Sequence, residues 1–228
     1  YGLICQPQNT TETAETIPRS TERDKLSGTV CLIFNGSVRD AKIMDQVIAD
    51  MEKFCIAHMY PDLMNLYGDR GNLICLQKRL EWYGFSCKIA SVYLGDRLDF
   101  EQIDMIFMGG GSDREQGLVY GDLVSKSDQL FAQIESGLPM LCICGAYQLL
   151  GAYYQSYDGQ TMQGLDFFDF YTQGRQDRLI GNILLESEID GVVTTLVGFE
   201  NHGGRTYFRD TALQPLGKVV AGYGNNGE

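Results

Sequence analysis

One stretch of the sequence decides the fold: Leu141-Cys142-Ile143-Cys144-Gly145-Ala146-Tyr147-Gln148. The apolar run 139–144 predicts a buried strand, and the segment 146–153 predicts a helix that begins directly after Gly145. A strand that passes at once into a helix is typical of a nucleophile elbow, a sharp turn that exposes one side chain above a parallel sheet. The pattern therefore predicts an α/β protein with Cys144 at the end of a strand.

Strands and helices alternate outward from this stretch. We expect strands at 54–58, 86–92 and 103–108, and helices at 71–82 and 122–136, the latter ended by Gly137. Short apolar strands that alternate with helices predict a mostly parallel sheet covered on both faces. After residue 165 the pattern changes to strands and turns at 167–171, 179–187, 192–199 and 218–222. These predict an antiparallel extension at one side of the sheet.

The first 52 residues differ from the rest. Residues 1–27 are polar and rich in Thr and Glu, which predicts a flexible tail. A strand at 29–34 and a helix at 41–53 predict a β-α extension over 28–52, with no role assigned to it. The domain proper is expected at 53–228, and its turn-like end at Gly224-Asn225-Asn226-Gly227-Glu228 indicates a truncated C-terminus. No signal peptide is evident at the start.

Composition excludes several classes of protein. The apolar fraction of 44% is that of a globular protein, and no apolar run approaches the ~20 residues of a membrane span. A formal charge of −12 argues against binding to nucleic acid or to anionic membranes, which select basic patches. The seven cysteines are widely spread, and Cys55, Cys75, Cys142 and Cys144 lie in apolar runs. This pattern predicts buried thiols in a reducing compartment, the cytoplasm.

Cys144 has the surroundings that a reactive thiol needs. The N-terminus of the expected helix lowers the pKa of a thiol, and its N–H groups can hold the oxyanion that forms when a thiolate attacks an amide. The alternative is an ordinary buried cysteine. We expect Cys142 to be such a core residue. A Cys-x-Cys metal site is not expected, because no other ligands cluster nearby.

A glycine loop follows the strand 103–108: Gly109-Gly110-Gly111-Ser112-Asp113-Arg114-Glu115. It lies at the carboxyl end of a strand, where ligands bind in open α/β sheets. Three glycines allow close approach of the backbone and offer N–H groups. The loop lacks the Gly-Lys-Ser/Thr of a phosphate-binding P-loop. It is either a tight turn or, beside Cys144, the source of a second oxyanion donor.

A cysteine nucleophile needs a base, and histidine is the usual one. The chain has two, His58 and His202. His58 ends a short apolar strand, and we interpret it as structural. On chemistry alone His202, in Gly198-Phe199-Glu200-Asn201-His202-Gly203-Gly204-Arg205-Thr206, would be the base.

Several stretches together resemble the class I glutamine amidotransferases of the cobyric-acid-synthase-like branch. The resemblance is specific and keeps its order over roughly residues 53–228. Within that branch it points to the glutaminase subunits that supply ammonia for amidation of lipid II. The matching stretches are Met64-Asn65-Leu66-Tyr67-Gly68-Asp69-Arg70-Gly71-Asn72, Gly109-Gly110-Gly111-Ser112-Asp113-Arg114-Glu115-Gln116, 142–148, Asp169-Phe170-Tyr171-Thr172, Arg178-Leu179-Ile180-Gly181, 198–207 and Gly222-Tyr223-Gly224-Asn225-Asn226.

The resemblance implies a flavodoxin-like sheet and a role for each matching residue. Cys144 is the implied nucleophile. The implied oxyanion hole consists of the N–H of Gly145 and the N–H of one glycine of the loop 109–111, with Gly110 as the first choice. Arg178 is implied in glutamine binding, through a bidentate grip on a carboxylate. The family's catalytic histidine lies in a Tyr-Leu-His-Gly-Pro-like segment, which is expected beyond residue 228. His202 belongs to another motif, and the resemblance sets it aside.

The implied activity is hydrolysis of glutamine to glutamate and ammonia, without a cofactor in this chain. The implied partner is a MurT-like Mur-ligase subunit, which would use ATP and Mg²⁺ to activate the stem-peptide D-glutamate of lipid II and then amidate it. Two alternatives stay open. One is a cobyric-acid-synthase-like subunit that acts on corrinoid side chains. The other is a non-catalytic binding subunit, because the histidine segment is absent from these 228 residues.

Overall fold

The computed structural model describes residues 2–4, 52–66, 68–189, 191–209 and 213–227. The expected strand at 29–34 and most of the expected helix at 41–53 lie outside these residues. The last two residues of that helix prediction, Glu52 and Lys53, are wrong, because they begin a strand. Apolar and β-branched residues follow them directly, and these pair more favourably in a sheet.

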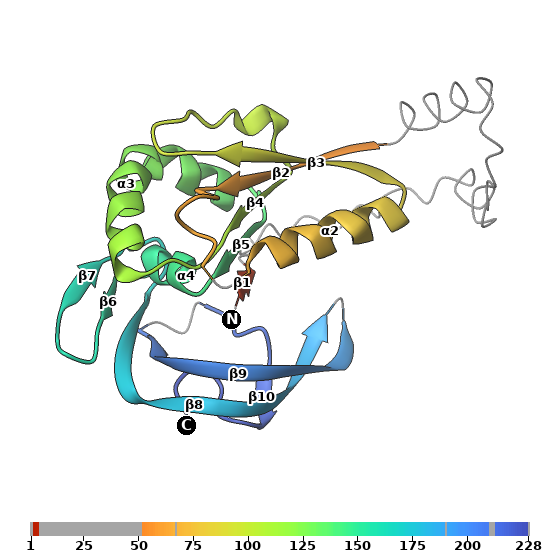
Figure 1. Cartoon of the computed structure of the whole chain (residues 1–228). Helices are drawn as coiled ribbons and strands as arrows, with labels where there is room; N and C mark the ends of the chain where they lie inside the picture. The colour runs from red at the N-terminus through yellow and green to blue at the C-terminus, as the bar shows by residue number, and fades with distance from the viewer. Residues whose placement is uncertain (1, 5–51, 67, 190, 210–212, 228) are drawn as a thin grey trace, which may run out of the picture.

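The first sheet has the order β1-β5-β4-β2-β3 (Figure 1). Four strands run parallel, and their centre is buried on both faces, as the near-continuous apolar sequence of β4 requires. β1 pairs antiparallel with β5, so residues 2–4 belong to the sheet and not to the tail expected over 1–27. The strands are β1 (Gly2–Ile4), β2 (Glu52–Met59), β3 (Phe85–Val92), β4 (Met105–Met108) and β5 (Met140–Ile143).

Helices cover both faces of this sheet, as the alternation of elements predicts. On one face Ile56 and Phe107 pack with Leu73 of α2 (Arg70–Trp82). On the other face their neighbours Ala57 and Ile106 pack with α3 (Asp113–Glu135) and α4 (Gly145–Leu150). Adjacent strand residues contribute to opposite faces because side chains alternate along a strand. A short 3₁₀ helix, η2 (Phe100–Gln102), precedes β4.

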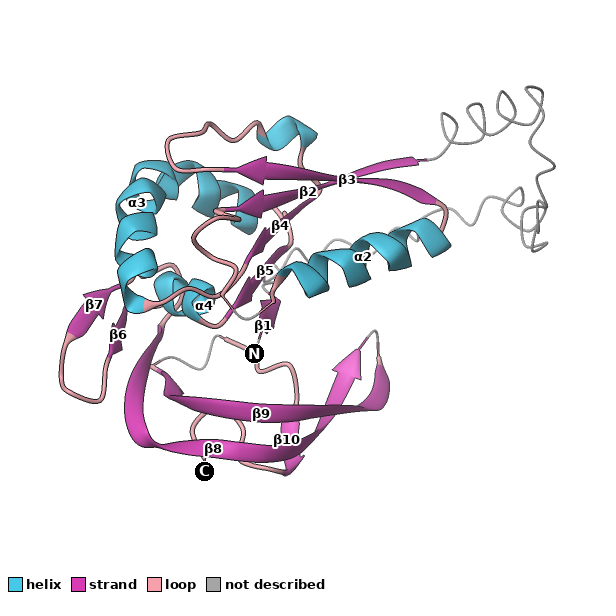
Figure 2. Cartoon of the chain, viewed as in Figure 1, coloured by secondary structure: helices cyan, strands magenta, loops and turns pink. Residues whose placement is uncertain are grey.

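The second sheet lies below the first in Figure 2. Its order is β10-β8-β6-β7, with β9 paired to β8, and every pairing is antiparallel except β6 with β8. The predicted antiparallel extension is therefore a mixed sheet. Its strands are β6 (Tyr153–Gln155), β7 (Thr161–Gln163), β8 (Phe170–Ile189), β9 (Val192–Phe208) and β10 (Lys218–Ala221).

Three predicted boundaries are wrong for identifiable reasons. The helix expected at 122–136 begins at Asp113, because burial of Val119 and Leu123 outweighs the low helix propensity of two glycines. The helix expected to reach residue 153 ends at Leu150, where Gly151 packs directly on Phe170. Of the strand expected at 167–171 only residues 170 and 171 are in a strand, and they belong with the strand expected at 179–187 to the single strand β8, which pairs with β9 on both sides of an irregularity.

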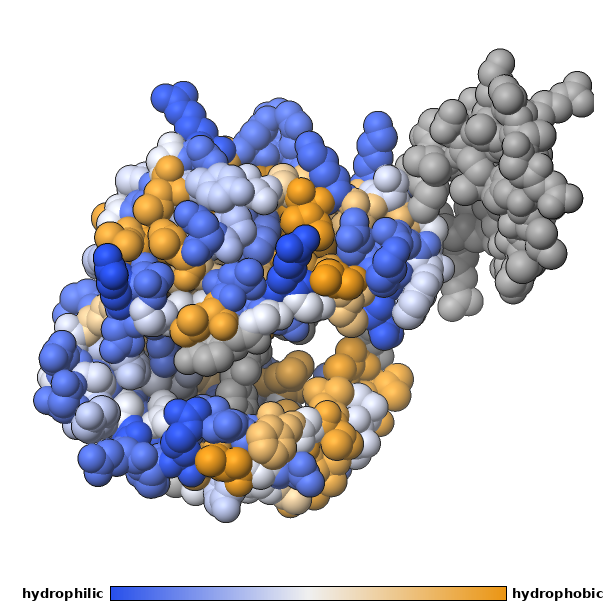
Figure 3. Space-filling model, viewed as in Figure 1, coloured by the Kyte–Doolittle hydropathy of each residue, from blue (hydrophilic) through white to orange (hydrophobic). Residues whose placement is uncertain are grey.

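The surface and the cysteines add two observations. None of the helices in the described part of the chain is long and apolar enough to cross a membrane. Apolar side chains gather over the β8–β9 hairpin at the lower right of Figure 3. On β9, Val197 and Phe199 are 81% and 67% exposed. The described cysteines are free thiols; Cys142 is buried as predicted, but Cys75 is exposed, contrary to its apolar setting in the sequence.

The carboxyl ends of β2, β4 and β5 lie side by side, because these three strands are neighbours and parallel. β2 leads into a loop that reaches Asp69, β4 leads into the glycine loop Gly109–Gly111, and β5 leads into Cys144. This edge of the sheet brings together residues that are far apart in sequence, in the position where ligands bind in open α/β sheets.

Candidate active site

Cys144 forms the elbow that its sequence predicts. It links β5 to α4 with φ 53° and ψ −116°, a conformation that costs a non-glycine residue about 1–3 kcal/mol. Gly145 follows because a Cβ there would lie 2.6 Å from Gln116 Nε2. Such strain is retained where it aims a side chain, and here it presents the thiol at the carboxyl edge of the sheet.

The Cys144 thiol is under opposing influences. Burial raises its pKa most, and the negative charge of Asp69 acts in the same direction. The Gly145 N–H, which donates to the sulfur, and the positive charge of Arg178 lower the pKa. The net result is a pKa above the ordinary thiol value, so the thiolate needs further stabilisation or a base to form.

The glycine loop is fixed by neighbours on two sides. On one side Gly110 N–H donates to Asp69 Oδ2 at 2.8 Å, and Gly110 O accepts from Leu66 N at 3.0 Å. Gly109 packs so closely there that a Cβ would lie 2.3 Å from the Met64 carbonyl oxygen. In this arrangement Gly110 N–H is occupied, so it does not offer itself to an oxyanion as the resemblance implies.

Gln116, in the first turns of α3, lies on the other side of the loop. Its Nε2 donates to Gly111 O at 3.1 Å, and the same atom packs on Gly145. The side chain is only 2% exposed, and its Oε1 has no hydrogen-bond partner among the described residues. One buried carboxamide therefore contacts both the glycine loop and the nucleophile elbow.

Arg178 lies in an irregularity of β8. The pairing of β8 with β9 shifts between Gly174 and Leu179, so residues 175–178 leave the regular ladder. Asn201 of β9 holds Arg178 through two hydrogen bonds of 2.8 Å, from Nε to Oδ1 and from Nη2 to the carbonyl oxygen. Bulges of this kind re-aim side chains beside active sites, and this one directs an exposed guanidinium whose charge acts on Cys144.

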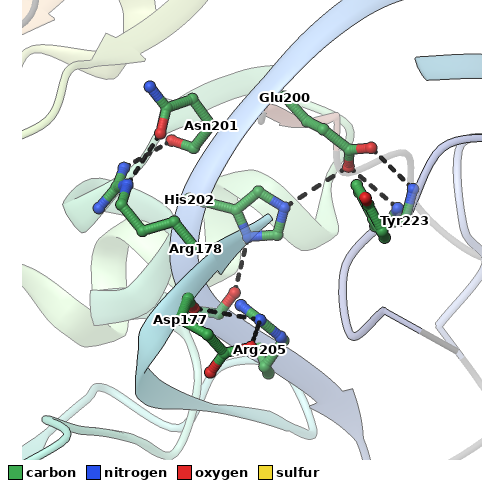
Figure 4. A network of polar contacts seen from close by, with 9 residues as sticks. Asp177, Arg178, Glu200, Asn201, His202, Arg205 and Tyr223 are labelled. Atoms are coloured by element: carbon green, nitrogen blue, oxygen red, sulfur yellow. Dashed lines mark hydrogen bonds and ion pairs between the residues drawn. The ribbon is translucent and has the colours of Figure 1, made fainter. Parts of the chain in front are cut away.

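His202 lies among the polar residues of the β8–β9 hairpin that Figure 4 draws together with Arg178 and Asn201. Its Nδ1 lies 2.7 Å from Gly204 O, and its Nε2 lies 3.6 Å from Glu200 Oε2. Glu200 is buried and also accepts from the N–H groups of Tyr223 (2.7 Å) and Gly224 (3.0 Å). Both ring nitrogens of His202 thus face acceptors of its own neighbourhood, as expected of a structural residue.

His58 and one cavity are further candidates for a functional role. His58 is buried on β2 with its ring edge-on to Phe107, and burial lowers its pKa. A largely apolar cavity of about 620 Å³ lies in the second sheet and is bounded by β8, β9 and the segment 214–226. Tyr147 lines it from α4, but Cys144, Gly111 and Arg178 do not.

Comparison with known proteins identifies the family to which this domain belongs. Residues 55–228 match the family of CobB/CobQ-like glutamine amidotransferase domains. The chain belongs to that family. This amidotransferase chain is 43% identical over 178 residues to the lipid II isoglutaminyl synthase (glutamine-hydrolyzing) subunit GatD of Staphylococcus aureus, covering 78% of the chain and 71% of that relative.

Two further relatives of this amidotransferase chain differ in the length of sequence that matches it. The corresponding subunit GatD of Streptococcus pneumoniae is 41% identical over 174 residues, which cover 76% of the chain and 66% of the relative. The chain thus spans about two thirds of the length of these relatives. A probable cobyric acid synthase of Methanocaldococcus jannaschii is 32% identical over 99 residues, 41% of the chain and 20% of that relative.

The amidotransferase fold brings together most of the predicted site. Cys144, Gly145 and the glycine loop meet at one edge of the first sheet, and the charge of Arg178 on β8 acts on Cys144, whereas His202 contacts Glu200 and Gly204. Sequence reasoning missed Asp69 and Gln116 as parts of the site. Both lie in stretches that carry the resemblance, but no local pattern shows that Asp69, 41 residues before Gly110, reaches the glycine loop, or that Gln116 packs on Gly145.

Proposed function

We propose that this chain is the glutaminase subunit of a lipid II isoglutaminyl synthase. It hydrolyses glutamine to glutamate and ammonia, and a MurT-like Mur-ligase subunit uses the ammonia to amidate the stem-peptide D-glutamate. The observation that carries the proposal is Cys144 in a strained elbow, beside a glycine loop and under the influence of the Arg178 charge, in a chain 43% identical to a subunit of that name.

The chemistry follows from the groups at this edge. The Cys144 thiolate attacks the carboxamide carbon of glutamine, and backbone N–H groups stabilise the oxyanion. The C–N bond breaks, the leaving nitrogen takes up the proton that the thiol lost to the base, and ammonia departs. A thioester between Cys144 and the glutamyl group remains. Water then hydrolyses the thioester to glutamate and returns the thiol. Arg178 binds the α-carboxylate of glutamine, and its two bonds to Asn201 hold the guanidinium in place for that contact.

His202 is not proposed as the base, because its ring nitrogens face Gly204 and Glu200. The resemblance assigns that role to a histidine in a segment outside these 228 residues. We assign the ATP and Mg²⁺ chemistry to the partner subunit. We also propose that the protein acts in the cytoplasm. The acidic chain and its free cysteines agree with a cytoplasmic setting.

Removal of the nucleophile tests the proposal. Cys144→Ala, in the chain assembled with its partner, should lower glutamine-dependent amidation about a thousandfold or more, whereas ammonium salts should still support amidation. Cys75→Ala is the control, because Cys75 is an exposed free thiol on α2. Retention of glutamine-dependent activity by Cys144→Ala would refute the assignment.

A second experiment separates catalysis from a purely binding role. A diazoketone analogue of glutamine should alkylate Cys144, and mass spectrometry should find the adduct on the peptide that contains this residue. Absence of an adduct would favour a non-catalytic subunit. A corrinoid acceptor is not supported to the same degree, because the similarity to the cobyric acid synthase covers only 20% of that relative.

A further inference from the structure

The direction of the peptide N–H groups in the glycine loop can be followed one residue at a time. Carbonyl and N–H point to opposite sides of a trans peptide, and the described residues contain no cis peptide. Gly110 O faces Leu66, so the N–H of the same peptide, that of Gly111, points away from the 63–69 loop. Asp69 occupies the preceding N–H, that of Gly110.

Gly111 is therefore the glycine with a free donor. Among the residues that the structure describes, its N–H has no hydrogen-bond acceptor, whereas its carbonyl is held by Gln116 Nε2. The peptides on both sides of Gly111 are thus fixed, one by Leu66 and one by Gln116. Because Gln116 also packs on Gly145, a single side chain connects the loop to the elbow, by a hydrogen bond on one side and by packing on the other.

We infer that Gln116 is a positioning residue that clamps the glycine loop to the elbow, so that the N–H groups of Gly111 and Gly145 form the oxyanion hole. This inference rests on the proposed function and replaces Gly110 by Gly111 as the second donor. Gln116 keeps a buried, unpartnered amide oxygen, which is unfavourable for stability. A residue retained for packing alone would not need that oxygen.

Gln116→Met is the first test, because methionine has a similar length and no N–H donor. In the full chain with its partner, kcat for glutamine hydrolysis should fall about tenfold to a hundredfold, with little change in KM. Affinity for the γ-aldehyde analogue of glutamine, which forms a tetrahedral adduct with Cys144, should fall in parallel. Alkylation of Cys144 by iodoacetamide passes through no oxyanion, so its rate should stay within about threefold.

The matched control is Gln129→Met, an exposed position on the same helix, which should leave all three readouts unchanged. If Gln116→Met leaves kcat and aldehyde affinity within twofold, the positioning role is refuted. Equal losses in iodoacetamide alkylation and in kcat would also overturn it, because they would show collapse of the elbow. A wild-type chain that hydrolyses no glutamine and forms no aldehyde adduct would instead reject the proposed function.

A backbone substitution identifies the donor directly. Replacing Gly111 by glycolic acid in cell-free translation exchanges one amide for an ester and removes one N–H. The Gly111 ester should lower kcat about a hundredfold, the effect of losing one oxyanion donor. The Gly110 ester, which removes only the N–H bound to Asp69, should cost less than tenfold. The reverse order would show that Gly110 is the donor and would refute the inference.

Discussion

At the scale of single residues, Asp69 places a buried carboxylate near the thiol that must lose its proton. It is 3% exposed, it holds the Gly110 N–H, and its charge raises the pKa of Cys144. A negative charge disfavours the thiolate, so the residue that anchors the glycine loop also opposes formation of the nucleophile. Loop geometry and thiol ionisation are coupled through one side chain.

Asp69→Asn separates these two effects, because asparagine keeps an oxygen for Gly110 N–H but loses the charge. Without that charge the thiolate is stabilised, so the pKa of Cys144 should fall. The midpoint of the iodoacetamide alkylation rate against pH should move to lower pH, and alkylation at neutral pH should be faster. Asp128→Asn, on the exposed side of α3, should leave the midpoint in place. A midpoint that moves upward would contradict this account.

At the scale of elements, the irregularity of β8 determines where Arg178 points. Residues 175–178 pass Gly203 closely, and a Cβ at Gly203 would lie 3.0 Å from Arg175 O. A regular ladder would alternate these side chains between the two faces of the sheet. The register shift frees Arg178 from that alternation, and this side chain donates two hydrogen bonds to Asn201, so β9 determines the orientation of a residue on β8.

Arg178→Lys should raise KM for glutamine about tenfold to a hundredfold with kcat nearly unchanged, because lysine cannot hold a carboxylate in bidentate fashion. Asn201→Ala should raise KM by a smaller factor, since it frees the guanidinium without removing it. Arg175→Lys serves as the control, because Arg175 is exposed in the same irregular segment. An equal change in KM for Arg175→Lys would show that general positive charge, and not orientation, binds the substrate.

At the scale of the whole molecule, Glu200 connects the long hairpin to the segment that follows β10. Its buried carboxylate accepts two backbone N–H groups at Tyr223 and Gly224, and His202 lies beside it. Gly222 has φ 106°, and a Cβ there would lie 2.7 Å from Glu200 Oε1. The motif that contains His202 thus connects β9 to the segment after β10 through the carboxylate of Glu200.

Glu200→Gln should lower the free energy of unfolding by about 1–3 kcal/mol, because the amide NH₂ cannot accept a backbone N–H. Hydrogen exchange at Tyr223 and Gly224 should accelerate, whereas exchange in β4 and β5 should change little. Chemical unfolding and exchange mass spectrometry give these two measurements. Glu188→Gln, an exposed carboxylate on β8, should have almost no effect on either. Unchanged protection from hydrogen exchange at residues 223 and 224 would argue against this connection.

The sequence alone is sufficient to predict the parallel sheet, its flanking helices and the elbow at Cys144. These follow from local patterns: an apolar run, a glycine directly after it, and the period of the neighbouring segments. It also led correctly to the amidotransferase family, because several separate stretches matched in order.

The tertiary structure determines which groups contact or influence the elbow. Asp69 and Gln116 reach the glycine loop through side-chain contacts across elements, and Arg178 depends on Asn201 of another strand. It also gave His202 a structural setting through contacts with Glu200 and Gly204. Asp69 lies 41 residues from Gly110 and Asn201 lies 23 residues from Arg178, so no local pattern records these two contacts. The first exists only once parallel strands bring their carboxyl ends to one edge, and the second only once β8 and β9 pair.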